Sequence, residues 1–260
     1  MYTCTYMCIY TPSVHPSIGT IHPLGPTCRT LMLPKQSPWL LGLVGDDMRG
    51  LRTEARECRV ELAGAVARGG PFRFACDVIK YVLYERGQFP RPYDQLVMFE
   101  SRRRPEARSL ATSRIAHSGR EAVQMLANMT ELFEHLETLF FMSVVPRMLL
   151  LIGGGLMSPR EVHELDMREM HVASSAKLHP GHCSREIFRE IFRQDLFGAL
   201  PPGTPTTTAI MFLAQRDCDV DWFHPKLSFH EPSRGMHPMI RLDGGDFVWF
   251  QAPLLLKGFQ

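Results

Sequence analysis

A change of hydrophobic periodicity near the middle of the chain constrains the fold more strongly than any other feature. From about Arg120 to Met142, apolar residues recur at the spacing of one helix face, and glutamates lie off that face. Pro146 is not compatible with a continuing helix. Residues 147–152 (RMLLLI) form an unbroken apolar run, which is typical of a strand buried on both faces. The sequence therefore predicts a long helix that is followed directly by a buried strand.

Other helices are expected on both sides of this point, and strands are expected to cluster at the end of the chain. Pro71 is a good first helical residue, and apolar side chains recur at helical spacing from there to about Gly87. A further helix is predicted from about Ser184 to Phe197. The remaining strand candidates are Thr206–Ala214, Lys226–Phe229, Met239–Leu242 and Phe247–Gln251. Helices first and clustered strands last predict an α+β fold rather than repeated βαβ units.

Two glycine-rich turns join these elements. The tripeptide Asp243-Gly244-Gly245 stands between two strand candidates and is a strong hairpin signal. After the run GGG at 153–155, Ser158 is a good N-cap residue, and Pro159 is a good first helical residue. Glu161 stands three positions after Ser158, which completes a capping box. The pattern predicts that a helix begins at Ser158.

Residues 1–65 differ from the rest of the chain. Prolines fall there at short intervals, without a sustained period of 2 or 3.6, and proline both lacks an amide donor and restricts the residue before it. We therefore expect a mostly disordered or atypical N-terminal tail over 1–65, in which residues 51–66 could form a short helix. Residues 66–260 are expected to form the folded domain.

Composition argues against several classes of protein. Hydrophobic residues make up 45% of the chain, which is enough for a core, and the formal net charge of +2 gives no support to nucleic-acid binding. The most apolar piece near the N-terminus, Trp39–Val44, is far shorter than the roughly 20 residues of a membrane helix. The seven cysteines have no CxxC spacing. Reduced thiols in the cytosol or nucleus are therefore favoured over a disulfide-bonded secreted domain.

Motifs for nucleotide and calcium binding are incomplete. To bind a dinucleotide, the glycine run at 153–155 would need Gly or Ala where Ser158 stands. The acidic run DCDVD at 217–221 imitates the start of a calcium loop, but the glycine and glutamate positions of that loop hold Trp222 and Ser228. The expected structures are a tight turn and an acidic turn before a strand.

One cluster of possible zinc ligands needs separate comment. His179, His182 and Cys183 lie together, but no second cluster at suitable spacing completes a site. Catalysis therefore has no positive support, and we expect no enzyme activity and no cofactor. A nucleotide- or metal-dependent enzyme that uses this loop or the glycine turn is the alternative.

The helix predicted at 184–197 has two interpretations. It carries two i,i+4 pairs, Ile187 with Ile191 and Phe188 with Phe192. Both phenylalanines fit a core, but such a broad apolar face can also serve the core on one side and a partner on the other. Large aromatic side chains are favoured anchors at interfaces. The pattern leaves both interpretations open.

Six blocks of sequence carry a resemblance to a known family. In order, they are KYVLYERGQFPRPYDQL (80–96), VVPRMLLLIGGGLMSPREVHELD (144–166), SREIFREIF (184–192), DWFHPKL (221–227), PSRG (232–235) and DFVWFQAPLLLKGF (246–259). The GGG-x-x-SP turn and the WFQAP-to-GF ending are the most specific. Together the blocks resemble the comet family of proteins that bind the spindle-checkpoint protein Mad-two, over about residues 70–260.

The resemblance implies a fold and a function without catalysis. The fold would be HORMA-like, with three main helices on a mostly antiparallel sheet and C-terminal safety-belt strands. The protein would bind the closed conformer of Mad-two through Phe188 and through the position occupied here by Glu85, where the family has Gln. A carboxylate cannot donate the hydrogen bonds that an amide can. The alternative within this fold is a module that closes its belt around a peptide motif.

The resemblance also implies a second partner. Pro225 and Lys226 would face a hexameric AAA+ ATPase that remodels Mad-two, so that mitotic checkpoint complexes are disassembled and the spindle checkpoint is silenced. The expected location is the nucleus and cytoplasm, and the spindle or kinetochore in mitosis, with no nucleic-acid or membrane partner. The aromatic residues expected in the belt and core are Trp222, Phe223, Trp249 and Phe250.

Overall fold

A computed structural model describes residues 3–12, 53–62, 64–102, 113–156, 158–173, 178–198, 200–229 and 246–260. The helices are α1 (Gly70–Glu85), α2 (Tyr93–Arg102), α4 (Ser113–Met142) and α5 (Pro180–Arg193). The strands are β1 (Thr3–Pro12), β2 (Thr53–Leu62), β3 (Arg147–Ile152), β4 (Glu161–Asp166), β5 (Thr207–Gln215), β6 (His224–Pro225), β7 (Phe247–Gln251) and β8 (Leu256–Lys257).

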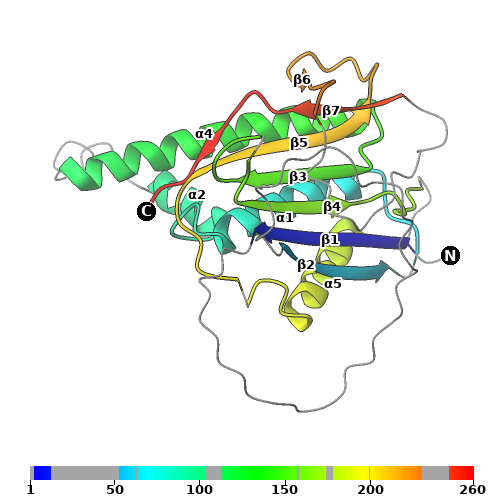
Figure 1. The fold of residues 1–260 in the computed structure, drawn as a ribbon, viewed down its shortest axis with the longest axis horizontal. Coiled ribbons are helices and arrows are strands. Elements are labelled where there is room, and N and C mark those ends of the chain that lie inside the picture. The colour runs from blue at the N-terminus through cyan, green and yellow to red at the C-terminus, as the bar shows by residue number, and fades with distance from the viewer. Residues whose placement is uncertain are drawn as a thin grey trace, which may run out of the picture.

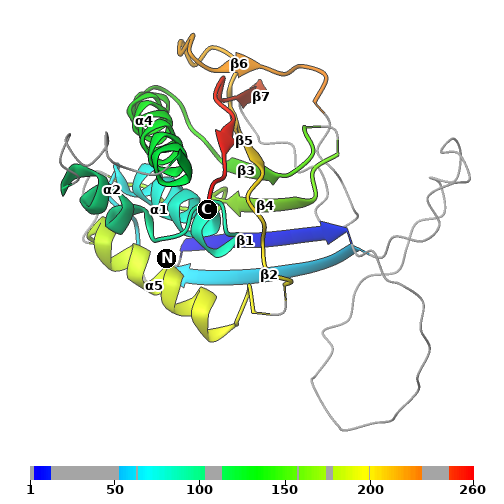
Figure 2. The same ribbon diagram turned by 90° about the vertical axis from the view of Figure 1, so that its left-hand side faces the viewer.

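The strands form one eight-stranded sheet in the order β2-β1-β4-β3-β5-β7-β6, and β8 also pairs with β5. Every pairing between these strands is antiparallel. The four described helices cover one face of the sheet, with α5 near the β2 edge and α4 near β5 and β7 (Figures 1 and 2). The predicted α+β class and the mostly antiparallel sheet are confirmed.

The principal core lies between the helices and the sheet, and a smaller one lies on the opposite face. Met148 and Leu150 of β3 are buried in the principal core. Leu149 and Leu151 belong to the second cluster, together with Trp249. Because strand side chains alternate between the two faces, a strand that is covered on both must be apolar throughout. This is the physical reason for the unbroken apolar run in β3.

Several elements match the sequence-based predictions. β3 and β7 occupy the predicted ranges, and β5 is displaced from its predicted range by one residue. α4 contains the predicted helix and begins earlier, at Ser113, while α1 begins at Gly70, next to Pro71. The C-terminal aromatic residues that were expected to be internal and are buried are Phe223, Trp249 and Phe250. Trp222 is half-buried.

The prediction of a helix that begins at Ser158 is wrong. The residues that follow form β4, which pairs with β3 on one side and with β1 on the other. The two partner strands pair with the backbone N–H and C=O groups of β4, so sheet pairing outweighs the local helix signal. Gly153 and Gly154 adopt φ values of 80° and 69°, and a Cβ on Gly154 would lie 2.3 Å from the carbonyl oxygen of Ser158. The glycine run therefore makes a tight β3–β4 turn that other residues fit poorly.

Two strands come from the stretch for which the sequence predicted no sheet. β1 and β2 pair over ten residues, and β1 also pairs with β4. Met7 of β1 and Cys58, Val60 and Leu62 of β2 are buried in the principal core. In β2 these apolar residues alternate with charged ones, which is the pattern of a strand with one buried face. The short helix expected over 51–66 is therefore wrong.

Some predictions are corrected in detail and others fall outside the described residues. Lys226–Phe229 is a turn after β6 rather than a strand, and α5 begins at Pro180 rather than at Ser184. The predicted strand Met239–Leu242, the hairpin that follows it and residues 13–52 of the predicted tail lie outside the described residues. The division of the chain at residue 65 stays a prediction.

Candidate protein-binding face

Helix α5 packs beside α1, and its start is well defined (Figure 2). His179 caps it, because its Nδ1 accepts a hydrogen bond from the amide of Gly181 at 3.2 Å, and Pro180 takes the first helical position. The Ser184 hydroxyl donates to Oδ2 of Asp77 on α1 at 2.8 Å. These contacts fix which side of α5 faces α1.

The four apolar residues of α5 divide between the core and the surface. Ile187 and Ile191 are buried. Phe188 is half-buried, and Phe192 is 62% exposed. The isoleucines therefore serve the core, Phe188 packs partly against it, and Phe192 faces outward. The interpretation that places both phenylalanines in the core is wrong for Phe192, and contact with a partner stays a prediction.

Tyr81 of α1 is the centre of an aromatic cluster at this surface. Its ring centroid lies 5.2 Å from that of Phe188, 5.6 Å from that of Phe192 and 5.4 Å from that of Phe197. All three contacts are edge-on, which is a favoured arrangement for aromatic rings. Burial raises the pKa of the Tyr81 phenol, and the charge of Glu85 and a hydrogen bond with it raise this pKa further. Tyr81 therefore stays neutral and donates to the Glu85 carboxylate.

The two positions that the resemblance singled out, Phe188 and Glu85, meet through Tyr81. Glu85 is half-exposed at the last position of α1 and lines a pocket of about 290 Å³ with Tyr81, Phe192 and Asp195. The surface combines two aromatic rings with two carboxylates. It can therefore pack against an apolar partner residue and accept hydrogen bonds from basic or amide groups beside it.

A buried ion pair supports this surface from below. The Arg86 guanidinium is 3% exposed and binds Glu161 of β4 through Nε at 2.7 Å and Nη2 at 2.6 Å. The same Nη2 donates to the carbonyl oxygen of Pro201 at 2.8 Å. His163 Nε2 lies 3.0 Å from Glu161, and its ring stacks on Phe197 with centroids 5.8 Å apart. The pair thus ties the end of α1 to β4 and to the segment that follows α5.

The protonation states of this cluster follow from its burial. Burial alone would raise the pKa of Glu161, but the hydrogen bonds from His163 and Arg86 outweigh it and lower that pKa to about 2. Burial lowers the pKa of His163 despite its bond to the carboxylate. We therefore assign a charged Glu161 and a neutral His163 at neutral pH.

Gln88 extends this support to the C-terminus. It is 1% exposed, and its amide nitrogen donates to the carbonyl oxygens of Arg86 at 2.7 Å and Thr204 at 3.0 Å. Its Oε1 accepts from the amide of Thr206 at 2.9 Å, and its backbone carbonyl accepts from the amide of Phe259 at 2.9 Å. The turn after α1 is therefore fixed by segments far away in the sequence.

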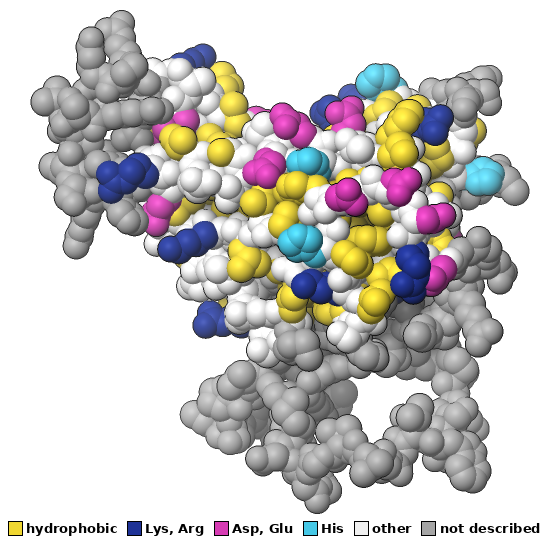
Figure 3. Space-filling model, turned by 90° about the horizontal axis from the view of Figure 1, so that it is seen from above, with side chains coloured by type: hydrophobic (Ala, Val, Ile, Leu, Met, Phe, Trp, Pro, Cys, Tyr) yellow, Lys and Arg dark blue, Asp and Glu magenta, His cyan; other side chains and the backbone are white. Residues whose placement is uncertain are grey.

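The other predicted contact pair lies at the opposite edge of the sheet. β6 is the last strand in the order, where Pro225 pairs with Phe250, and the Lys226 amide donates to Trp249 at 2.7 Å. Pro225 is exposed and Lys226 is half-exposed. Figure 3 views the α4, β6 and β7 side, where hydrophobic, acidic and histidine side chains are interspersed. The structure therefore does not bring Pro225 and Lys226 together with Phe188 and Glu85.

The possible metal and nucleotide sites have structural explanations. Within the described ranges, no group of three or more His, Cys, Asp or Glu residues could hold a metal ion. Of the suspected zinc ligands, His179 caps α5 and Cys183 is buried. The glycine run closes the β3–β4 turn. No helix in the described part of the chain is both long and apolar enough to cross a membrane.

Sequence reasoning missed the residues that organise this face. Tyr81 stands four positions before Glu85 in a helix, and this spacing could have indicated their contact. The pairing of Arg86 with Glu161 had no such signal, because 75 residues separate them and Glu161 was expected in a helix. Asp195 also became part of the face only through the turn after α5.

Comparison with known proteins places the chain in a family. Residues 50–260 match the family described as p31comet, Mad1 and Cdc20-bound-Mad2 binding. The chain is 36% identical over 224 residues to the MAD2L1-binding protein of Homo sapiens, an alignment that covers 79% of this chain and 81% of that protein. It is 35% identical over 216 residues to the MAD2L1-binding protein of Mus musculus, with coverage of 77% and 78%. The chain therefore belongs to the p31comet family, which is described by binding to Mad1 and Cdc20-bound Mad2 rather than by a reaction.

Proposed function

We propose that this protein is a non-enzymatic adaptor that binds the closed conformer of Mad2 (Mad-two) through the face formed by α1 and α5. The observation that carries the proposal is the aromatic cluster around Tyr81, from which Phe188 and the 62% exposed Phe192 face outward. An exposed phenylalanine contributes little to folding, whereas a partner that covers it gains a large apolar contact. Family membership supports Mad2 as that partner.

Phe188 has the properties of an interface anchor. It is half-buried, so its ring is held in place by Tyr81 before a partner binds. A side chain that is already ordered loses little conformational entropy on binding. Glu85 and Asp195, which line the pocket with Tyr81 and Phe192, supply acceptors for donors of the partner. The face therefore combines a preorganised aromatic centre with a polar rim.

The test is titration calorimetry with the closed form of Mad2. Phe188→Ala is expected to weaken binding by about 2 kcal/mol or more, which is roughly 30-fold. Phe192→Ala should also weaken binding, and it avoids a change in the core. Phe141→Ala is the matched control, because Phe141 is 66% exposed on α4 and lies outside this face. Equal affinities for wild type, Phe188→Ala and Phe192→Ala would overturn this assignment.

Glu85 allows a separate test of the polar rim. Its carboxylate accepts the Tyr81 hydrogen bond and can only accept from a partner. Glu85→Gln keeps the size of the side chain and adds donor capacity. Glu85→Ala removes the side chain beyond Cβ, and with it the acceptors of the carboxylate. If the residue contacts Mad2, the two variants should differ in affinity, and identical affinities across wild type and both variants would exclude it from the contact.

We further propose that the bound Mad2 is presented to a hexameric AAA+ ATPase, which disassembles mitotic checkpoint complexes and silences the checkpoint. The exposed edge strand β6 supports Pro225 and Lys226 as the ATPase-facing surface, since they lie at the sheet edge opposite to the α5 side. A bound Mad2 on α1 and α5 would leave this edge free.

A double variant separates the two contacts. Pro225→Ala with Lys226→Ala is expected to bind Mad2 with unchanged affinity but to lose stimulation of Mad2 remodelling by the ATPase. Remodelling can be followed by the release of Mad2 from Cdc20. Normal stimulation by the double variant would remove the adaptor role from this segment, while leaving the Mad2-binding proposal intact.

A further inference from the structure

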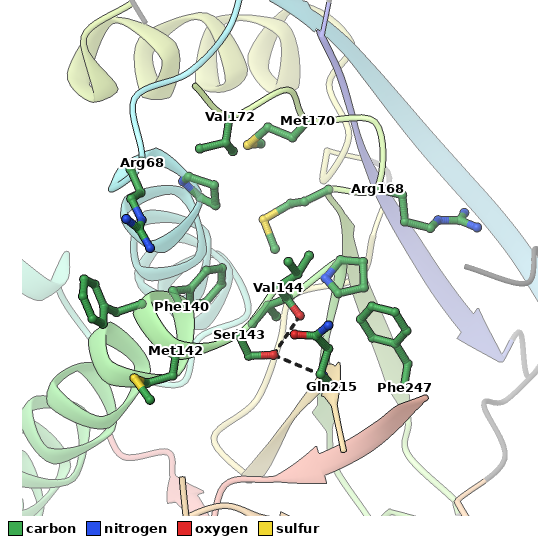
Figure 4. A pocket seen from close by; sticks show the side chains of 15 residues that line it. Arg68, Phe140, Met142, Ser143, Val144, Arg168, Met170, Val172, Gln215 and Phe247 are labelled. Carbon is green, nitrogen blue, oxygen red and sulfur yellow. Dashed lines mark hydrogen bonds between the residues drawn. The ribbon is translucent and has the colours of Figure 1, made fainter. Parts of the chain in front are cut away.

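A second surface lies at the other end of α1 from Glu85. The 16 residues of α1 span about 24 Å, and their first turn borders a groove with a volume of about 560 Å³. The groove is formed by the end of α4, by the segment that joins α4 to β3, by the segment after β4 and by the facing ends of β5 and β7 (Figure 4). None of its lining residues belongs to the α1 and α5 face.

The groove exposes apolar side chains that the fold does not use. Val145 and Met167 are buried and form its base. On its α4 side, Phe141, Met142 and Val144 are 66%, 53% and 62% exposed. A contiguous group of this kind differs from the scattered exposed apolar residues of an ordinary surface and marks an interaction site.

The charge of the groove is one-sided. Its lining contains two arginines and neither aspartate nor glutamate. Arg168 is neutralised, because its guanidinium binds the Asp166 carboxylate. The Arg68 guanidinium lies 5.1 Å from the centroid of the Phe141 ring, and no ion pair with a carboxylate of the described residues is found for it. Arg68 is therefore a cation that is held against an exposed aromatic ring.

The wall beside Arg68 adds to this positive potential. The first turn of α1 has no acidic residue and no side-chain hydrogen bond at its N-cap, Gly69. The N-terminal end of the helix carries a partial positive charge, and its Gly70 amide is already bound to the Ala67 carbonyl at 2.7 Å. The C-terminal end of α4, with the opposite partial charge, forms the facing wall. An acidic group in the groove is therefore expected on the Arg68 side and an apolar group on the α4 side.

The Ser143 hydroxyl in the base of the groove already has partners. The Ser143 hydroxyl accepts from the backbone N–H of Gln215 at 3.2 Å and donates to the Val144 carbonyl at 3.3 Å, as the dashed lines in Figure 4 show. This hydroxyl is therefore satisfied without a ligand, and we expect the selectivity of the groove to rest on Arg68 and on the apolar walls.

We propose that this groove binds a short linear segment of a partner protein in which a bulky apolar side chain lies next to Asp or Glu. The apolar side chain would pack against Met142, Val144 and Met167, and the carboxylate would pair with Arg68. The volume is in the range of ligand pockets, about 300–1,000 Å³, and suits a few side chains. Charge complementarity favours an acidic segment, because the lining of the groove contains no carboxylate that could pair with a basic segment.

The test selects phage-displayed random short peptides on the full-length protein and then measures the enriched peptides by fluorescence anisotropy. We expect enriched peptides to share a bulky apolar residue beside Asp or Glu. Arg68→Glu should weaken their binding about tenfold or more, since a hydrogen bond to a charged group contributes roughly 1.5–3 kcal/mol. Met142→Lys should weaken it as well, and added salt should weaken binding to wild type.

Matched controls exist elsewhere on the surface. The Arg91 guanidinium lies 5.1 Å from the centroid of the exposed Phe99 ring, which repeats the Arg68 geometry outside the groove. Met98 is 53% exposed, as Met142 is. Arg91→Glu and Met98→Lys should leave peptide binding unchanged, and the groove variants should leave affinity for Mad2 unchanged.

Several results would overturn the proposal. These are the absence of any enriched peptide, enriched peptides without Asp or Glu, and equal binding to wild type and Arg68→Glu. A dimer seen in analytical ultracentrifugation and abolished by Met142→Lys would identify a second copy of the chain as the occupant instead, and would equally overturn it.

Discussion

The two ends of α1 carry exposed aromatic surfaces that are built in different ways. Near Glu85, the rings of Phe188 and Phe192 belong to the regular helix α5 and contact Tyr81 on the neighbouring helix α1. Near the first turn of α1, the groove is assembled from helix ends, strand ends and connecting segments, and Phe141 contacts Arg68 rather than other rings. The first surface is acidic at its rim and the second is basic.

This difference shows which kind of surface can be recognised from the sequence alone. A face on one helix repeats at helical spacing, so Phe188 and Phe192 stand out in the chain. A groove made of unconnected segments has no period. The first surface also rests on a buried ion pair and on β2, whereas the second depends on the ends of elements. The two regions should therefore respond differently to changes in the support beneath them.

The largest effect is expected from removal of β1 and β2, because α5 packs on β2. A chain that begins at Val66 loses the buried Val60 and Leu62, which alone contribute about 3–6 kcal/mol. It also exposes the edge of β4, which favours aggregation. Urea unfolding followed by circular dichroism should show a large loss of stability against the full chain. An unchanged midpoint would instead support a domain boundary at residue 65.

The second largest loss of stability is expected when the ion pair between Arg86 and Glu161 is broken. Arg86→Met leaves the partly buried Glu161 without its cation, and removal of one partner of a buried pair costs up to about 3–5 kcal/mol. Arg73→Met is the control, because the Arg73 side chain is 62% exposed in its pair with Asp77 and should contribute at most about 1 kcal/mol. Both can be measured by urea unfolding, and similar losses for the two variants would contradict the proposed support.

A smaller effect is expected from pH. Burial lowers the pKa of His163, so the unfolded chain takes up a proton near pH 6.5 while the folded protein does not. Unfolding free energy should therefore fall as the pH drops below about 6.5, by up to roughly 1.4 kcal/mol per pH unit. Below the ordinary pKa of 4.5, Glu161 adds a further loss until about pH 2. His163→Phe should flatten the slope between pH 7 and 5, and an unchanged slope would refute this origin.

The smallest effects are expected at the two aromatic surfaces themselves. Phe192→Ala and Phe141→Ala remove side chains that are 62% and 66% exposed, so each should change the unfolding free energy by at most about 0.5 kcal/mol. Phe192→Ala should weaken binding of Mad2, and Phe141→Ala should not. A large destabilisation by either variant would show that its ring serves the fold rather than a partner.

Much of the fold could be predicted where local signals agreed with tertiary pairing. The apolar run of β3, the aromatic run of β7 and the periodic helices α1 and α4 lie close to where the patterns placed them. The prediction failed at β4, where a capping box at Ser158 favoured a helix but two neighbouring strands offered backbone partners. It also failed for β1 and β2, two strands of ten residues each, because the closely spaced prolines of residues 12–38 argued against a sheet.

The candidate site was predictable only in part. Phe188 stood out through helical spacing and family resemblance, and Glu85 through the resemblance alone. The contact of Tyr81 with Phe188 and the ion pair of Arg86 with Glu161 were missed because these partners are distant in sequence, whereas the spacing of Tyr81 and Glu85 was an available signal that was not used. Whether Glu85, Pro225 and Lys226 contact partners stays a prediction.

The sequence by itself determined the α+β class, the buried central strand, the broad apolar face of α5 and the family. Those features depend on periodicity, composition and motifs, which are local properties of the chain. Only the tertiary structure decided that Glu161 pairs with Arg86, that Tyr81 links Glu85 to Phe188, and that Arg68 meets Phe141 in a groove. The physical reason is that these contacts form between segments that the sheet brings together, so their energies depend on geometry that no local pattern contains.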